Sequence, residues 1–174
     1  IVNSYKKHHR IIFNGNGYSN EWVEEAKRRG LSNLPSMIDA IPALVSDNAV
    51  KLFEEFEVFT RKELESRVEI EYEAYSKAIN IEAKTMIDIA GKSIIPAVIR
   101  YTTRLADSII KLKAAIDGIE PYAQNAILLE VNEHLKEAKV EIENLKGHMD
   151  KVAEISDVTE HARDMHEVVV PAME

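Results

Sequence analysis

The stretch that decides the fold is TRKELESRVEIEYEAYSKAINIEAKTMIDIAGKSIIPAVIRY, residues 60–101. Its apolar residues recur in steps of three and four, which is the period of an α-helix that buries one face. The positions are Leu64, Val68, Tyr72, Tyr75, Ile79, Ala83, Met86, Ala90 and Ile94. The sequence therefore predicts one long amphipathic helix that begins just after Thr60.

The two ends of this helix carry their own signals. Thr60 and Glu63 form a capping box, in which each side chain satisfies a free backbone N–H at the helix start. Near the other end, Pro96 lacks an N–H and crowds the preceding turn. We therefore expect the helix axis to bend at Pro96, or two helices to meet there.

Further apolar seams follow, separated by stop and start signals. Asp117-Gly118 ends the first, Pro121 suits the start of the next helix, and Asp157 with Glu160 offers a second cap. The seams are Val98, Tyr101, Leu105, Ile109, Leu112 and Ile116; then Ile127, Val131, Leu135, Ala138, Ile142, Leu145, Met149 and Val152; then Val158, Ala162, Met165 and Val169. Amphipathic helices joined by short turns pack most simply as an antiparallel bundle of three to four long helices.

The first 59 residues differ, because glycine and proline punctuate them. We expect a helix over 22–29 that Gly30 ends, short turns around Pro35 and Pro42, and a helix over 47–56 capped by Ser46. Residues 5–12 fit either a short helix or a strand. The predicted fold is thus all-α, with a short irregular helical segment (1–59) followed by the bundle (60–174).

Composition excludes several classes of protein. The chain has 174 residues, a formal net charge of −8 and no cysteine. The negative charge argues against a nucleic-acid partner, and the lack of cysteine excludes a disulfide framework and a cysteine-ligated zinc. No apolar run approaches the roughly 18 residues of a membrane helix, so we expect no membrane partner.

The most suggestive motif for chemistry is Asn14-Gly15-Asn16-Gly17, which precedes a predicted helix. A dinucleotide fingerprint needs a third glycine, but Asn20 stands at that position, and no P-loop pattern occurs in the chain. Asn-Gly pairs are common turn formers, so we interpret the motif as a structural turn. An anion site at the following helix start is the alternative.

The histidines give no metal site. None of His8, His9, His134, His148, His161 and His166 has a carboxylate three positions before it, as a di-iron bundle requires. The pairs Glu130/His134 and Asp157/His161 share a helix face, which is typical of weak surface ion pairs. A phosphorelay pattern also fails, because Glu143 stands where the histidine before Lys146-Gly147 is needed.

Basic and aromatic residues have structural explanations. Lys27, Arg28 and Arg29 lie at the C-terminal end of a predicted helix, where cations complement the helix dipole. Trp22 and the tyrosines at seam positions are interpreted as packing residues. We therefore predict no catalytic residue, no cofactor-binding residue and no metal ligand in this chain.

Several longer strings carry a resemblance. They are KKHHRIIFNGNGYSNEWVEEAKRRGLSNLPSMIDAIPALVS (6–46), FTRKELESR (59–67), INIEAKTMIDIAGKSIIPAVIRY (79–101) and VVVPAM (168–173). Together they resemble the C-terminal part of the bacterial type III glutamine synthetases. The resemblance implies that residues 1–59 close the catalytic domain and that 60–174 form a helical extension specific to type III enzymes.

What the resemblance implies for function is a fragment of a larger enzyme. The family uses ATP and divalent Mg²⁺ or Mn²⁺ to join glutamate and ammonia, in large homo-oligomers, and its active site lies upstream of this region. The chain begins at Ile1 without Met, and we expect both ends to be cut and the fragment alone to be inactive. Its expected partners are the rest of the chain and neighbouring subunits, in the cytoplasm. The alternative is a stand-alone helical interaction module.

Overall fold

The computed structural model describes residues 2–174, and among them every regular element is helical. The all-α prediction is therefore confirmed. The chain divides into two compact units, Ile1–Ala40 and Ile41–Glu174. No helix in the described part is both long enough and apolar enough to cross a bilayer.

The described part of the first unit, residues 2–40, contains short helices only. They are α1 (Val2–His8), the 3-10 turn η1 (His9–Ile11), α2 (Asn20–Arg28) and α3 (Met37–Ala40). Residues 5–12, which the sequence left open between helix and strand, are helical up to Ile11. Among the apolar residues at positions 2–40, only Ala26 and Ile38 are buried.

Gly30 ends α2 as expected. It has a φ of +73°, and the amides of Gly30 and Leu31 donate to the carbonyls of Lys27 and Ala26 at 3.0 and 2.9 Å. This pair of bonds is a Schellman motif, in which a left-handed residue closes the helix and satisfies two free carbonyls. A glycine adopts that conformation without the steric penalty of a Cβ.

The second unit begins with the 3-10 turn η2 (Ile41–Val45), which packs on α5, and helix α4 (Asp47–Glu55). Ser46 caps α4 by accepting the Ala49 amide, which confirms the predicted cap. The same type of closure ends α4, but here Glu57 occupies the left-handed position with a φ of +54°. A glutamate at such a position is strained, because its Cβ crowds the backbone.

Helix α5 (Arg61–Ile89) starts with the predicted capping box, since Glu63 N donates to Thr60 Oγ1 at 3.4 Å and Thr60 N donates to Glu63 Oε2 at 2.7 Å. The Thr60 hydroxyl also donates to Glu63 Oε2, at 2.8 Å. The two hydrogen bonds that Thr60 donates to this carboxylate, mainly the one from its backbone and next the one from its hydroxyl, lower the pKa of Glu63. The box therefore fixes the boundary between α4 and the long helices.

The predicted interruption at Pro96 is a π-helical turn, η3 (Ala90–Ile94), that joins α5 to α6 (Ile95–Ala115). The Ile95 amide donates to the Ala90 carbonyl, five residues back, and Pro96 follows at the start of α6. Two helices thus meet where the sequence predicts a change. The wide turn lets the chain remain helical through a residue that has no N–H.

The π turn also corrects the predicted seam. Ile94 is 55% exposed, and Ile95 takes its place on the half-buried face. One extra residue in the turn rotates everything after it by about one position, or roughly 100°. The seam therefore steps by five residues from Ala90 to Ile95.

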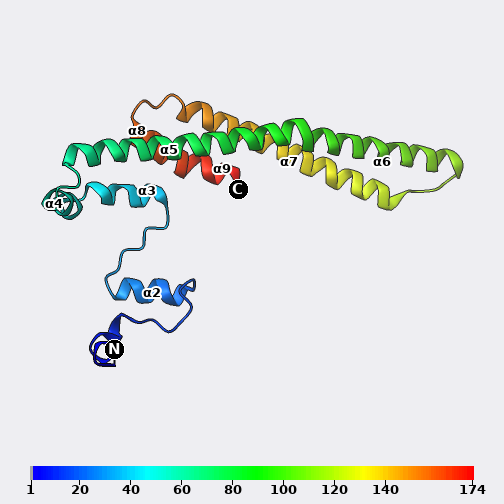
Figure 1. Cartoon of the computed structure of the whole chain (residues 1–174). Coiled ribbons are helices and arrows are strands. Elements are labelled where there is room, and N and C mark those ends of the chain that lie inside the picture. Colours follow the sequence, from blue (N-terminus) through cyan, green and yellow to red (C-terminus); the bar gives the residue numbers. More distant parts are fainter. Residues whose placement is uncertain (1) are drawn as a thin grey trace. The chain divides into compact units, whose positions relative to one another are not determined.

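After a turn at Gly118, helix α7 (Tyr122–Val152) runs back beside α6 and part of α5, as Figure 1 shows. Pro121 precedes α7 as its N-cap residue and not as its first residue. The chain then forms α8 (Val158–Asp164), a second π turn η4 (Met165–Val169) and α9 (Val170–Met173). Asp157 caps α8 by accepting the Glu160 amide at 2.8 Å.

The core of this unit lies where α5, the end of α7 and the C-terminal helices meet. Its buried members are Ala83, Leu145, Met149, Val152, Met165 and Val169. Helix α6, by contrast, has no buried residue. Several predicted seam residues are exposed there and nearby, namely Met86, Tyr101, Ile116, Ile127 and Ala138.

Candidate functional site

The glycine motif before α2 is a turn that packs an aromatic ring. Phe13 and Trp22 have ring centroids 4.8 Å apart, and a Cβ on Gly15 would lie 2.5 Å from Phe13 Cζ. Neither Gly15 nor Gly17 has a positive φ, so the glycines are not needed for a left-handed turn. Gly15 instead leaves room for the Phe13 ring.

The start of α2 is occupied by its own loop. Ser19 Oγ donates to the Asn16 carbonyl at 2.7 Å, and the Tyr18 amide donates to Asn16 Oδ1 at 3.0 Å. Ser19 stands at the N-cap position but makes no side-chain capping bond. The loop hydrogen bonds therefore serve the turn itself.

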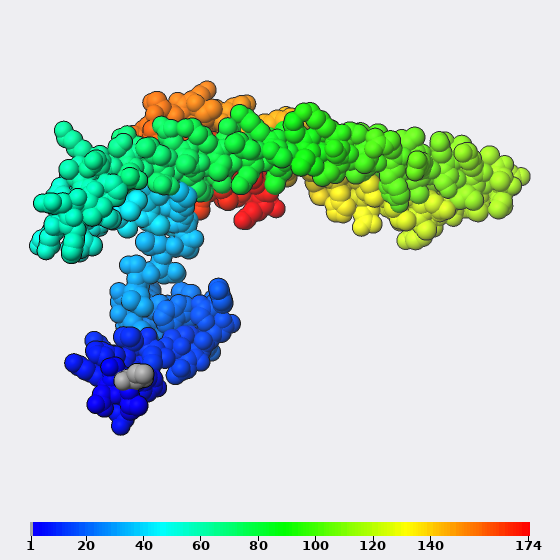
Figure 2. Space-filling view, viewed as in Figure 1, coloured from blue at the N-terminus to red at the C-terminus, as the bar shows by residue number. Residues whose placement is uncertain are grey.

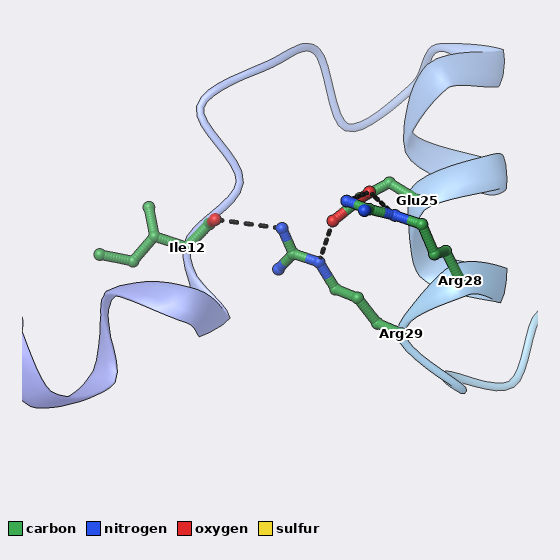
Figure 3. A network of polar contacts seen from close by, with 4 residues as sticks. All are labelled: Ile12, Glu25, Arg28 and Arg29. Carbon is green, nitrogen blue, oxygen red and sulfur yellow. Dashed lines mark hydrogen bonds and ion pairs between the residues drawn. The ribbon is translucent and has the colours of Figure 1, made fainter.

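A second polar cluster ties α2 to the preceding segment. In Figure 3 the Arg29 guanidinium lies between Glu25 and the Ile12 carbonyl, and Arg28 approaches the same carboxylate. Arg29 Nε donates to Glu25 Oε1 at 2.5 Å and its Nη2 donates to the Ile12 carbonyl at 3.3 Å. The hydrogen bonds that Glu25 accepts, mainly from Arg29 and next from Arg28, lower the pKa of its carboxyl group. Arg28 and Arg29 of the predicted basic cluster are thus bound within the chain.

The histidine pairs form differently from expectation. His134 Nδ1 lies 3.1 Å from Glu137 Oε2, and no contact joins it to Glu130. Asp157 is used as the cap of α8. Within residues 2–174, no three His, Asp or Glu side chains come together in a way that could hold a metal ion.

Sequence reasoning missed one contact in the core. Tyr75 on α5 and His166 in the π turn η4 join through the phenol oxygen and Nδ1, 3.0 Å apart. The pKa of Tyr75 is raised mainly by burial of its side chain and, to a smaller extent, by the negative charge of Glu82. The phenol therefore keeps its proton. The two residues are 91 positions apart, and only the packing of η4 on α5 brings them together.

The same region carries an open cavity of about 370 Å³ between α5, the end of α7 and α8. Its rim includes Lys77, Lys84 and His161, and Met149 and Met165 form part of its apolar floor. Lys77 is paired with Glu73 at 2.7 Å. Ser76 donates to the Tyr72 carbonyl, so its hydroxyl proton is engaged within the helix. The Ser76 hydroxyl is thus not paired with a base in this cavity.

A comparison of the chain with known protein families identifies the family to which these features belong. Residues 1–113 match the model of the glutamine synthetase C-terminal domain. The chain belongs to this family. The match includes the Phe13 turn, the Glu25 cluster, the capping box and the first π turn, and it ends within α6.

Individual relatives agree with this assignment of the C-terminal domain. The chain is 43% identical over 111 residues to a glutamine synthetase of Butyrivibrio fibrisolvens, covering 64% of this chain and 16% of the relative. It is 38% identical over 124 residues to the type-3 glutamine synthetase of Dictyostelium discoideum, covering 71% of this chain and 17% of the relative.

A third relative matches a longer stretch of this C-terminal-domain chain at lower identity. A glutamine synthetase of Bacteroides fragilis (strain YCH46) is 28% identical over 157 residues, which covers 90% of this chain and 21% of the relative. The chain therefore spans about a fifth or less of the length of these relatives.

Proposed function

We propose that this chain is the C-terminal helical region of a glutamine synthetase, an ATP-dependent ligase that joins glutamate and ammonia, and that its role is structural. The observation that carries this proposal is the family match over residues 1–113. The relatives named glutamine synthetase, one of them type-3, support it.

In this proposal the two predicted segments have different tasks. Residues 1–59 close the catalytic domain, and 60–174 form the helical extension. Large apolar side chains are exposed across the first segment, which suits a surface that packs on the rest of the enzyme. They include Tyr5, Ile11, Tyr18, Leu31, Leu34, Leu52, Phe56 and Val58.

The chemistry belongs to other parts of the enzyme. ATP and Mg²⁺ or Mn²⁺ are the reactants and ions that the whole ligase uses, and the part of this chain that the structure describes provides no group of three acidic or histidine side chains to hold such an ion. We assign no catalytic residue here. The partners are the remainder of the synthetase chain and neighbouring subunits.

The test is an assay of glutamine formation with the isolated chain, ATP, Mg²⁺ or Mn²⁺, glutamate and ammonia. The full-length type-3 relative from Dictyostelium discoideum, assayed in parallel, is the positive control. We expect turnover from the relative and none from the chain. Clear turnover by the chain would overturn the structural role. A gene that encodes only these residues would favour a stand-alone interaction module.

A further inference from the structure

Helix α6 carries a second uncharged stripe beside the seam that meets α7. Its members follow one another in steps of three and four, so they share one helix face. They are Pro96, Ile99, Thr103, Ala106, Ile110 and Ala114. Ile99 is 49% exposed and Ile110 is 65% exposed. Thr103 and Ala114 are exposed as well, whereas Pro96 and Ala106 are half-buried.

Helix α7 carries a matching stripe on the side away from its half-buried residues. Tyr122, Leu129 and Val140 are 83%, 72% and 49% exposed, and Ala126 lies between the first two. Their spacing again places them on one helix face, which the exposed Glu133 interrupts between Leu129 and Val140. Both helices of the hairpin thus carry large apolar side chains that stay exposed among the described residues of the second unit.

The rest of the bundle shows what covers such faces elsewhere. At the other end, α8, η4 and α9 pack on α5 and α7 and complete a closed core. In Figure 2 the α6/α7 end of this unit (green to yellow) extends beyond the orange and red C-terminal helices. A hairpin of two helices needs further helices to bury both of its apolar faces, and a four-helix bundle is the common solution.

The charges of the two helices identify the partner. Helix α6 carries four Lys or Arg against Asp107 alone, whereas residues 122–143 carry five Glu against Lys136 and Lys139. Lys113 of α6 forms an ion pair with Glu120, at 3.5 Å, in the turn that precedes α7. Arg100, Arg104 and Lys111 make no ion pair with any described residue. On α7, by contrast, Glu133, Glu137 and Glu143 pair with Lys136, His134 and Lys139 of the same helix. Even so, residues 122–143 keep a formal net charge of −3 and α6 keeps one of +3. The two helices therefore present net charges of opposite sign.

We infer that the α6/α7 hairpin docks on a second copy of this chain, with α6 of each copy packed on α7 of the other. This inference rests on the proposed structural role and narrows it to one surface and one partner. A two-fold axis makes each contact occur twice, so a basic and an acidic arm in one chain make a self-complementary surface. Flanking charges of this kind set partner choice and orientation in helix bundles.

Sedimentation velocity of the 174-residue chain tests the inference. The wild-type chain is expected to be dimeric at about 100 μM, where a complex of micromolar Kd is largely formed. The double variant Ile99→Glu/Ile110→Glu is expected to raise the Kd at least about tenfold, because it places charges in an apolar contact.

A matched control uses two isoleucines with the same spacing on α5. Ile70 and Ile81 are 61% and 64% exposed and lie outside the hairpin. The variant Ile70→Glu/Ile81→Glu adds the same charge and is expected to leave the Kd within about twofold. Far-UV circular dichroism checks that both variants remain helical.

Charge exchange gives the sharper test. The variants Arg100→Glu/Arg104→Glu and Glu133→Lys/Glu137→Lys should each weaken self-association, because like charges then meet at both contacts. Mixing the two variants should restore a dimer, because opposite charges then meet at both contacts. A wild-type chain that stays monomeric, a dimer that tolerates Ile99→Glu/Ile110→Glu, or a mixture without recovery would overturn the inference. None of these results affects the glutamine assay, so failure of the surface and failure of the structural role are distinguishable.

Discussion

The two compact units are built from the same kind of local signals but differ in what they bury. Residues 2–40 have a Schellman closure at Gly30 and an ion-paired Glu25, yet only Ala26 and Ile38 among their apolar residues are buried. Residues 41–174 add long seams, and most of the buried apolar residues lie there. Caps and turns thus define helices, and only long seams that meet one another produce a core.

The largest expected effect comes from placing a charge in the core of the second unit. Val169 is fully buried, and Val169→Asp should lower the free energy of unfolding by about 4 kcal/mol or more, because the carboxylate would have no partner. Urea titration followed by far-UV circular dichroism measures the change. Val23→Asp in the first unit is the control, since Val23 is 43% exposed. Equal losses from the two variants would break the comparison.

A cavity in the second unit should cost less. Leu64 is 1% exposed, and Leu64→Ala should destabilise the chain by about 2–5 kcal/mol through lost burial and a residual cavity. Leu31→Ala in the first unit, where Leu31 is 51% exposed, should change stability by less than about 0.5 kcal/mol. The same urea titration ranks the two, and a larger loss at Leu31 would contradict the assignment of the core.

The capping box at the start of α5 shows how much a single helix cap contributes, compared with the buried core. Thr60→Ala should cost about 1 kcal/mol, since it removes the side-chain acceptor for the Glu63 amide. The pKa of Glu63 is lowered in the folded chain, so its contribution is present above the ordinary carboxyl pKa of 4.5 and is lost as the pH falls below that value.

Urea titrations at neutral pH and in acid measure this dependence. Thr60→Ala should lose less stability on acidification than the wild-type chain does, because its Glu63 no longer has the threonine side chain as a partner. An unchanged pH profile in Thr60→Ala would show that the threonine hydroxyl does not cause the shift.

The smallest effects concern the two left-handed helix closures, one in each unit. Glu57→Gly should stabilise the second unit by about 0.5–1 kcal/mol, because glycine removes the Cβ that crowds the backbone at a φ of +54°. Gly30→Ala should destabilise the first unit by about 1 kcal/mol at its φ of +73°. Thermal unfolding of both variants checks the signs, and a loss of stability in Glu57→Gly would refute the strain at that residue.

Local patterns predicted the helices well because their causes lie within a few residues. The caps at Ser46, Thr60 and Asp157 and the closure at Gly30 all form as expected. The predicted seam failed at Ile94, because a π turn before Pro96 shifts the register by one residue. A similar turn precedes Pro171, where the Val170 amide donates to the Met165 carbonyl.

The predicted absence of catalytic and ligand-binding residues stays a prediction. The motif Asn14-Gly15-Asn16-Gly17 runs into a hydrogen-bonded turn over residues 16–19, as the turn interpretation expected in part. The role of Gly15 differs from that interpretation, because Gly15 leaves room for Phe13 and has no positive φ. The Tyr75–His166 contact had no sequence signal, because it depends on two helices that are far apart in the chain. The domain boundary after residue 59 likewise stays a proposal.

The sequence by itself determined the helical class, the places where most helices begin and end, and the family, because periodicity, capping and motif identity are written in neighbouring residues. Only the tertiary structure decided which apolar faces are covered. Seams of similar composition run along α5, α6 and α7, yet the core closes at the α5 end, because the C-terminal helices return there and leave the α6/α7 arms with open faces. Burial depends on contacts between distant segments, and no local pattern encodes how far a returning segment reaches.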